Sequence, residues 1–178
     1  MEIIESLKQW YKIYVTHKDL VTKSILRIED QDYGYLVIRK ENKEHVYFFE
    51  HLHEFTHAKD KDKQVMYTLV VPNTLSNFRE LAALWDTFVQ FSFLKIIFVN
   101  PMFTSQGSSN NKWIIIPAVH NKIADKSRLE QGFYGLSEQV PLLETGMPPV
   151  QHDPQPVEKK KRKKQGDEDE EAIDDEDL

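Results

Sequence analysis

The chain has 178 residues, no cysteine and a formal net charge of −6 at pH 7. The lack of cysteine excludes disulfides and thiolate sites, so a metal ion would need His, Asp or Glu ligands. The first fifteen residues mix charged with apolar side chains, unlike a signal peptide, and no apolar run reaches the roughly 20 residues that span a bilayer, so we expect an intracellular, cytoplasmic protein without a membrane segment.

The first predicted elements are a helix and three strands. Apolar side chains recur at helical spacing over residues 3–14, which predicts an amphipathic helix. Three segments that follow are rich in residues that favour strands: 24–30, 33–40 and 45–51. A short turn separates the first two, and residues 41–44 (ENKE) form the predicted turn before the third, so the three strands are expected to form a meander.

Residues 64–99 are predicted to form a strand, a helix and a second strand. The two strands are residues 64–71 and 94–99. Between them, apolar residues over 75–89 are spaced by three and four, which predicts the clearest helix of the chain. Its candidate caps are Asn73, Thr74 and Asn77. A right-handed crossover makes the two strands parallel and places the helix on one face of the sheet.

The last predicted elements are a strand within residues 112–120 and a helix within residues 125–140. Pro117 favours an edge position or a bulge for the strand. Gly132 and Gly135 either weaken the helix or mark close packing on the sheet. The pattern as a whole predicts a single α/β (α+β) domain with a mixed sheet of about five or six strands and about three helices.

Domain boundaries follow from changes in composition. Residues 1–143 are rich in aliphatic and aromatic side chains and long enough to bury one core, which predicts one globular domain. Residues 144–157 contain four prolines and no apolar periodicity, which is typical of an extended linker. Residues 158–178 are predicted to be a disordered tail, because dense blocks of like charge repel one another.

The tail consists of two blocks of opposite charge. The basic block, residues 159–164, comprises Lys159, Lys160, Lys161, Arg162, Lys163 and Lys164. The acidic side chains of residues 167–178 are Asp167, Glu168, Asp169, Glu170, Glu171, Asp174, Asp175, Glu176 and Asp177. Residues 1–157 have a net charge of only −2, so they lack the strong positive field of an autonomous nucleic-acid-binding domain. The basic block is suited to phosphate or partner contacts, and the acidic block can occupy a basic groove or mask the basic block.

Residues 53–57 read HEFTH, which matches the signature of zinc peptidases. His53 and His57 would share one helix face, Glu54 would activate a metal-bound water, and Glu80 could supply a third ligand. The flanking residues argue against the match, because a strand is predicted before it and a solvated segment after it. An exposed, His-rich connection is the alternative interpretation.

A second candidate site resembles the metal site of restriction-type nucleases. Such enzymes bind magnesium with an acid on one strand and a Glu-x-Lys on the next, a pattern that Asp30 or Asp32 with Glu41 and Lys43 would supply. Here the Glu-x-Lys falls in a predicted turn, where charged residues are ordinary. The chain has no Walker loop, Gly-x-Gly-x-x-Gly or nucleophile motif, and we predict neither a cofactor nor a catalytic or metal site.

The chain combines several features that one known family shares. They are a compact cysteine-free domain, a Pro-rich linker, the basic block KKKRKK, an acidic terminus, and the segments FLKIIFVNP and KWIIIPAVHNKIAD. In this combination the chain resembles the larger of the two small accessory subunits of the replicative family-B DNA polymerase of Sulfolobus-type archaea. The resemblance covers the domain order and the tail more than any diagnostic motif. That family is non-enzymatic, so the resemblance transfers no catalytic residue.

The resemblance implies an archaeal protein that binds the polymerase catalytic subunit through its folded domain, with a second small subunit as a further candidate partner. The tail would act near DNA, directly through the basic block or indirectly, and limit strand displacement. Two alternatives remain open: a zinc metallopeptidase that uses HEFTH, and a nucleic-acid- or chromatin-associated protein in which the basic block is a nuclear localisation signal. The tail could also be a solubilising terminus alone.

Overall fold

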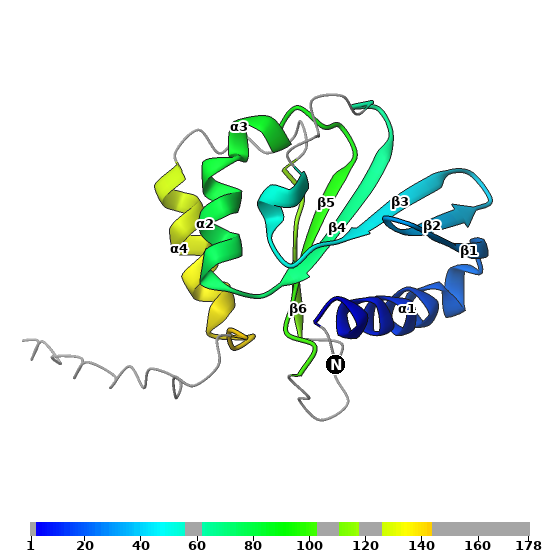
Figure 1. Ribbon diagram of the computed structural model, residues 1–178, viewed down its shortest axis with the longest axis horizontal. Helices are drawn as coiled ribbons and strands as arrows, with labels where there is room; N and C mark the ends of the chain where they lie inside the picture. Colours follow the sequence, from blue (N-terminus) through cyan, green and yellow to red (C-terminus); the bar gives the residue numbers. More distant parts are fainter. Residues whose placement is uncertain (1–2, 56–61, 103–110, 118–125, 144–178) are drawn as a thin grey trace, which may run out of the picture. The chain divides into compact units, whose positions relative to one another are not determined.

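The computed structural model describes residues 3–55, 62–102, 111–117 and 126–143 (Figure 1). Its helices are α1 (Ile3–Thr22), α2 (Leu75–Ala83), α3 (Trp85–Phe88) and α4 (Lys126–Ser137). Its strands are β1 (Ile25–Gln31), β2 (Gly34–Arg39), β3 (Lys43–Phe48), β4 (Met66–Pro72), β5 (Leu94–Val99) and β6 (Lys112–Ile115). The six strands form one mixed sheet, which confirms the predicted single α/β domain.

The strands lie in the sheet in the same order as in the sequence, from β1 to β6. Strands β1, β2 and β3 pair antiparallel, which confirms the predicted meander. The β4 strand runs parallel to both β3 and β5, so the predicted β-α-β unit is also confirmed. Strand β6 pairs antiparallel with β5 and lies at the sheet edge, as Pro117 suggests.

The sheet separates two buried apolar layers, with α1 on one face and the other helices on the opposite face (Figure 1). Helix α1 packs Leu7, Tyr11 and Val15 against side chains of β2 to β5, because residues four apart lie on one side of a helix. On the other face, Phe78 of α2 stacks on Phe133 of α4, with ring centroids 3.8 Å apart. Burial of each such large apolar side chain stabilises the fold by about 1.5–3 kcal/mol.

Helix α1 is longer than predicted, since it continues from residue 14 to Thr22. Its last turns carry exposed residues such as Leu20 and Val21, so apolar spacing does not reveal them. The helix ends where Lys23 adopts a left-handed φ of 45° and donates its N–H to the carbonyl oxygen of Asp19 at 2.7 Å. Neither α1 nor any other helix of the described residues is long and apolar enough to cross a membrane.

The predicted turn over residues 41–44 is wrong in its second half. Lys43 and Glu44 begin β3, which ends at Phe48 instead of continuing to residue 51. The hairpin closes with a hydrogen bond of 2.9 Å from the Arg39 N–H to the Asn42 carbonyl oxygen, so the turn is shorter than predicted. Glu44 occupies a buried strand position because cationic side chains compensate its charge, which apolar patterning cannot reveal.

The predicted helix over residues 75–89 is divided at Leu84 into α2 and α3. Of the three candidate caps, Thr74 is the N-cap, and its hydroxyl accepts a hydrogen bond from the Asn77 N–H at 3.2 Å. Trp85 and Phe88 of α3 are buried, so the break keeps the apolar face directed at the sheet. No residue type at this position indicates the division in advance.

Helix α4 begins close to the predicted position but ends at Ser137, and Val140 is buried beyond its end. The interpretation of Gly132 and Gly135 as close-packing positions is wrong. A Cβ atom at either glycine would meet no atom within 4 Å, and both residues are exposed. They therefore lower helix propensity without allowing a closer approach to the sheet.

Candidate functional site

The predicted linker and tail, residues 144–178, lie outside the described residues, but the structure defines the place where they attach. The N–H of Leu143 donates to the carbonyl oxygen of Asn73 at 2.9 Å. The carbonyl oxygen of Pro141 accepts from the side-chain amides of Asn73 at 3.3 Å and Asn100 at 2.9 Å. Because Asn73 and Asn100 directly follow β4 and β5, the linker begins beside the carboxyl ends of these two parallel strands.

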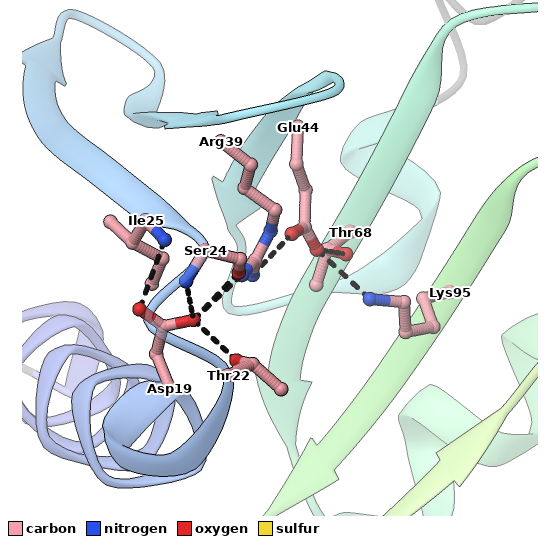
Figure 2. Close-up of polar contacts among 8 residues, drawn as sticks. All are labelled: Asp19, Thr22, Ser24, Ile25, Arg39, Glu44, Thr68 and Lys95. Atoms are coloured by element: carbon pink, nitrogen blue, oxygen red, sulfur yellow. Dashed lines mark hydrogen bonds and ion pairs between the residues drawn. The ribbon is translucent and has the colours of Figure 1, made fainter.

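A buried carboxylate connects four strands on the face of the sheet that α1 covers (Figure 2). The side chain of Glu44 on β3 is only 2% exposed. Its Oε2 accepts a hydrogen bond from Arg39 on β2 at 3.0 Å, and its Oε1 accepts one from Lys95 on β5 at 3.0 Å. The hydroxyl of Thr68 on β4 also donates to Oε1. Strands far apart in the sequence thus share one charged centre.

The environment of Glu44 keeps its carboxyl group ionised. Burial alone raises the pKa of Glu44, because a charged carboxylate loses hydration. The positive charge of Lys95 and the hydrogen bonds from Thr68, Lys95 and Arg39 outweigh this effect, so the pKa lies below its ordinary value. The buried group is therefore a paired anion at neutral pH.

A second carboxylate extends this arrangement to the end of α1 (Figure 2). Asp19 Oδ1 accepts from the Ser24 hydroxyl at 2.6 Å and the Thr22 hydroxyl at 2.7 Å, and Oδ2 accepts from the Ile25 N–H at 2.9 Å. These bonds, above all the one from Ser24, hold the pKa of Asp19 far below its ordinary value. Arg39 donates to the Ser24 hydroxyl at 3.1 Å and so connects Asp19 with the Glu44 centre.

This charged network supports the fold and is not suited to catalysis. Each oxygen of Glu44 already accepts a hydrogen bond from a positively charged side chain, so the carboxylate is compensated and a poor ligand for a further cation. A general base needs a free lone pair directed at a substrate, and the low exposure of Glu44 leaves no access for one. We therefore interpret the network as the element that fixes β2 to β5 against the end of α1.

The residues of the nuclease-like pattern are not brought together. Asp30 pairs with Tyr35 of β2, whereas Lys43 pairs with Ile38, so the two lie about 10 Å apart along the strands in addition to two strand spacings. Glu41 lies beyond Lys43 in the hairpin turn, still farther from Asp30. All three charged residues are exposed, as is Asp32. The strand register therefore separates the acid from the Glu-x-Lys.

Only the first three residues of HEFTH, 53–55, lie within the described residues. Residues 52–55 form one 3₁₀ turn that three residues separate from the end of β3, and His57 falls outside the described part of the chain. The Glu54 carboxylate accepts a hydrogen bond from the His51 N–H at 2.8 Å, so it caps its own turn. Phe55 is buried at 2% exposure and anchors the turn in the core.

The structure instead brings His53 together with His51 and Glu80. His53 Nδ1 lies 3.1 Å from Glu80 Oε2, and His51 Nδ1 lies 3.7 Å from Glu80 Oε1. One ligand atom from each of the three residues lies within 4.8 Å of the other two. Glu80 of α2, the possible third ligand of the HEFTH alternative, thus lies beside His53, and the second histidine beside it among the described residues is His51.

Sequence reasoning missed two chemically notable residues, Glu44 and His51. Glu44 falls in the predicted turn over residues 41–44, and its neighbours Lys43 and His45 are polar, so the local sequence carries no signal of its burial. His51 was assigned to the end of a strand. The His-x-His spacing of residues 51 and 53 is a signal for a shared metal or carboxylate partner.

Comparisons of the chain with protein-family models, curated proteins and solved structures gave no match. The interpretation of function therefore rests on the residues and on the geometry described above.

Proposed function

We propose that this protein is a non-catalytic accessory subunit of a replicative family-B DNA polymerase. Its folded domain binds the catalytic subunit, and its charged tail limits displacement of the strand ahead of the polymerase. The observation that carries the proposal is the composition of the tail, in which six adjacent bases precede a block with nine acids in twelve residues. A folded domain does not need such a segment for its stability. The dense charge of the tail therefore favours a role in contacts with other molecules.

The attachment of the tail supports this role. Leu143 is fixed to Asn73 by a backbone hydrogen bond, so the tail is tethered at a defined place on the domain. The 23 residues 144–166 that precede the acidic block can extend at most about 80 Å. A polyanion tethered within this radius has a raised effective concentration at any basic groove nearby and competes there with displaced single-stranded DNA.

The arrangement of the carboxylates in the domain also favours a binding role over catalysis. Glu44 is compensated by Arg39 and Lys95, and the register of the meander separates Asp30 from Glu41. A subunit that acts through binding needs neither group to be free. The proposal includes a cytoplasmic location, a second small subunit as a further partner, and DNA contacts that are either indirect or made by the basic block.

The partner is tested by affinity capture from native lysate with three forms of the protein: the full chain, a chain ending at Val157 and a chain ending at Leu143. Recovery of a family-B polymerase by all three forms is the expected result, because the partner site lies in the folded domain. Recovery by the full chain alone would show that the tail, not the domain, provides binding. Failure of the full chain to recover any replication protein would overturn the proposal.

The role of the tail is tested in a strand-displacement assay with the recovered polymerase. We expect the chain ending at Val157 to permit more displacement than the full chain, with a difference that shrinks as salt rises, since ionic competition is screened. A full-length variant with the nine tail acids changed to Asn or Gln is the matched control for charge. If this variant limits displacement as the natural chain does, the electrostatic mechanism is wrong.

A further inference from the structure

A small cluster of metal-binding side chains lies where the chain leaves β3 and meets α2. His51 and His53 flank Leu52 in the connecting turn, and Glu80 projects from α2. Zinc binds imidazole nitrogen and carboxylate oxygen at about 2.0–2.2 Å, which separates two tetrahedral ligand atoms by about 3.3 Å. The observed separations are 3.1 Å from His53 Nδ1 to Glu80 Oε2 and 3.7 Å from His51 Nδ1 to Glu80 Oε1, and one ligand atom from each residue lies within 4.8 Å of the other two. The side chains therefore need to close by only about 1–2 Å to reach the spacing of a zinc site.

The turn that carries the two histidines is held rigidly without a metal. Leu52 is fully buried, and its N–H donates to Asn77 Oδ1 at 2.8 Å. The Asn77 amide donates to the carbonyl oxygens of Glu50 and Pro72, each at 3.0 Å. Asn77 is itself fully buried, so these bonds are protected from water. The backbone between His51 and His53 is therefore fixed by Leu52 and Asn77, so both histidines lie next to α2 without a metal.

The glutamate is oriented as well. The backbone N–H of His53 donates to Glu80 Oε2 at 2.8 Å, and the Ser76 hydroxyl lies 3.4 Å from Oε1. Each carboxylate oxygen has two lone pairs, so these contacts leave one on each oxygen for a metal. Hydrogen bonds to a ligating carboxylate are the kind of support that natural metal sites use.

Two imidazole rings approach the same carboxylate. The rings of His51 and His53 stack with centroids 5.4 Å apart, and each has its Nδ1 within 3.7 Å of a Glu80 oxygen. A metal ion can bind a nitrogen of both rings and the carboxylate at once. The histidine side chains are 49% and 58% exposed, so an ion can enter from solvent.

We propose that His51, His53 and Glu80 form a binding site for a divalent transition metal ion, with Zn²⁺ as the ion that the ligand set fits best. The site has three protein ligands and leaves a fourth position open to water or to a group from a partner. It fastens the turn after β3 to α2. This site differs from the HEFTH arrangement. It combines His53 with His51, whereas HEFTH combines His53 with His57.

The test is a Zn²⁺ titration of the metal-free full chain, without an affinity tag, followed by calorimetry at pH about 7.5, because protons compete with the metal for its ligands at lower pH. We expect one tight site above the weak background of the acidic tail. The variants His51→Ala, His53→Ala and Glu80→Gln should each weaken that site by at least about tenfold. His17→Ala, an exposed histidine on α1, and His57→Ala should leave it unchanged.

Two outcomes would overturn the proposal. One is binding that persists unchanged in the triple variant of His51, His53 and Glu80, which would show that the zinc is bound elsewhere in the chain. The other is loss of binding in His53→Ala and His57→Ala but not in His51→Ala, which would favour the HEFTH arrangement. Circular dichroism and thermal unfolding of each metal-free variant separate loss of a ligand from loss of the fold. Zn²⁺ should raise the melting temperature of the natural chain and not that of Glu80→Gln.

Discussion

The ammonium nitrogen of Lys95 lies 3.0 Å from Oε1 of Glu44, although the two residues are 51 positions apart in the sequence and β4 lies between their strands. The contact joins the antiparallel meander to the parallel half of the sheet through a charge. A buried carboxylate that loses its partners is far less stable than one that keeps them. The mixed sheet therefore depends on a polar centre as well as on its two apolar layers.

The Glu44→Ala variant tests this dependence. It leaves Arg39 and Lys95, which are 21% and 31% exposed, without their carboxylate. Water can partly hydrate these two cations in the variant. We therefore expect the free energy of unfolding to fall by about 2–4 kcal/mol, somewhat less than for a fully buried ion pair. Urea unfolding measures the change. Glu41→Ala, in the exposed turn before β3, is the control and should alter stability by less than about 0.5 kcal/mol.

The same network predicts a loss of stability in acid. The pKa values of Asp19 and Glu44 are lower in the folded chain than their ordinary values of 3.8 and 4.5. Their stabilisation is therefore complete above those ordinary values and disappears as the pH falls through the lowered pKa values of the folded state. Urea midpoints of the natural chain should decline below pH about 4.5, and those of Glu44→Gln should decline less. Equal declines in both proteins would contradict the prediction.

Gly34 at the start of β2 is expected to tolerate no side chain. Its φ of 144° lies in a region that other residues rarely adopt, and a Cβ atom would lie directly against the carbonyl oxygen of Val46. We expect Gly34→Ala to lower the free energy of unfolding by about 2–4 kcal/mol, because the β2–β3 pairing must shift. Chemical denaturation measures the change. A loss under about 1 kcal/mol would show that the hairpin relaxes around the methyl group.

Gly132 and Gly135 in α4 are expected to behave in the opposite way. Both are exposed, both lie within the helix, and a Cβ atom at either position meets nothing within 4 Å. Replacement by alanine should raise the free energy of unfolding by about 0.5–1 kcal/mol at each site, because alanine loses less backbone entropy in a helix. The double variant Gly132→Ala/Gly135→Ala should melt at a higher temperature. Unchanged or lower melting would indicate contacts made by residues outside the described ranges.

Asn77 offers a test of the turn after β3. Its fully buried amide forms hydrogen bonds with the backbone of Leu52, Glu50 and Pro72, so Asn77→Ala removes three buried or partly buried hydrogen bonds. We expect a loss of about 2–3 kcal/mol in the free energy of unfolding. Asn42→Ala, at an exposed position of the β2–β3 turn, is the matched control. If both variants lose the same small amount, the turn is not held by Asn77.

Most of the fold could be predicted from the sequence because its elements follow simple periodicities. The apolar run at 94–99 indicates a strand covered on both faces, and β5 has these bounds. Residues 75–89 show helical spacing, which revealed α2 and α3 but not their division at Leu84. The last turns of α1 were missed, because the residues from His17 to Thr22 do not repeat an apolar pattern.

The candidate metal centre was only partly accessible from the sequence. The sequence offers His53 and Glu80 only as possible ligands of the HEFTH alternative, since both belong to residue types that bind zinc. The approach of His51 to Glu80 depends on a 3₁₀ turn that is fixed by Leu52 and Asn77, and that turn results from tertiary contacts. The burial of Glu44 could not be predicted for a related reason. Its partner Lys95 lies on a strand far away in the sequence, and the two meet only in the assembled sheet.

The side chain of Trp10 donates a hydrogen bond to Asn111 at 3.1 Å, and the two residues are 101 positions apart. The apolar face of α1 also contacts Ile97 and Val99, so the helix covers strands that are synthesised much later than the helix itself. Until β5 is available, only side chains of β2 to β4 cover this face of the helix. A nascent chain stalled before residue 94 should therefore leave part of the apolar face around Leu7 and Tyr11 open to chaperones, and α1 should complete its docking only after β5 has paired with β4.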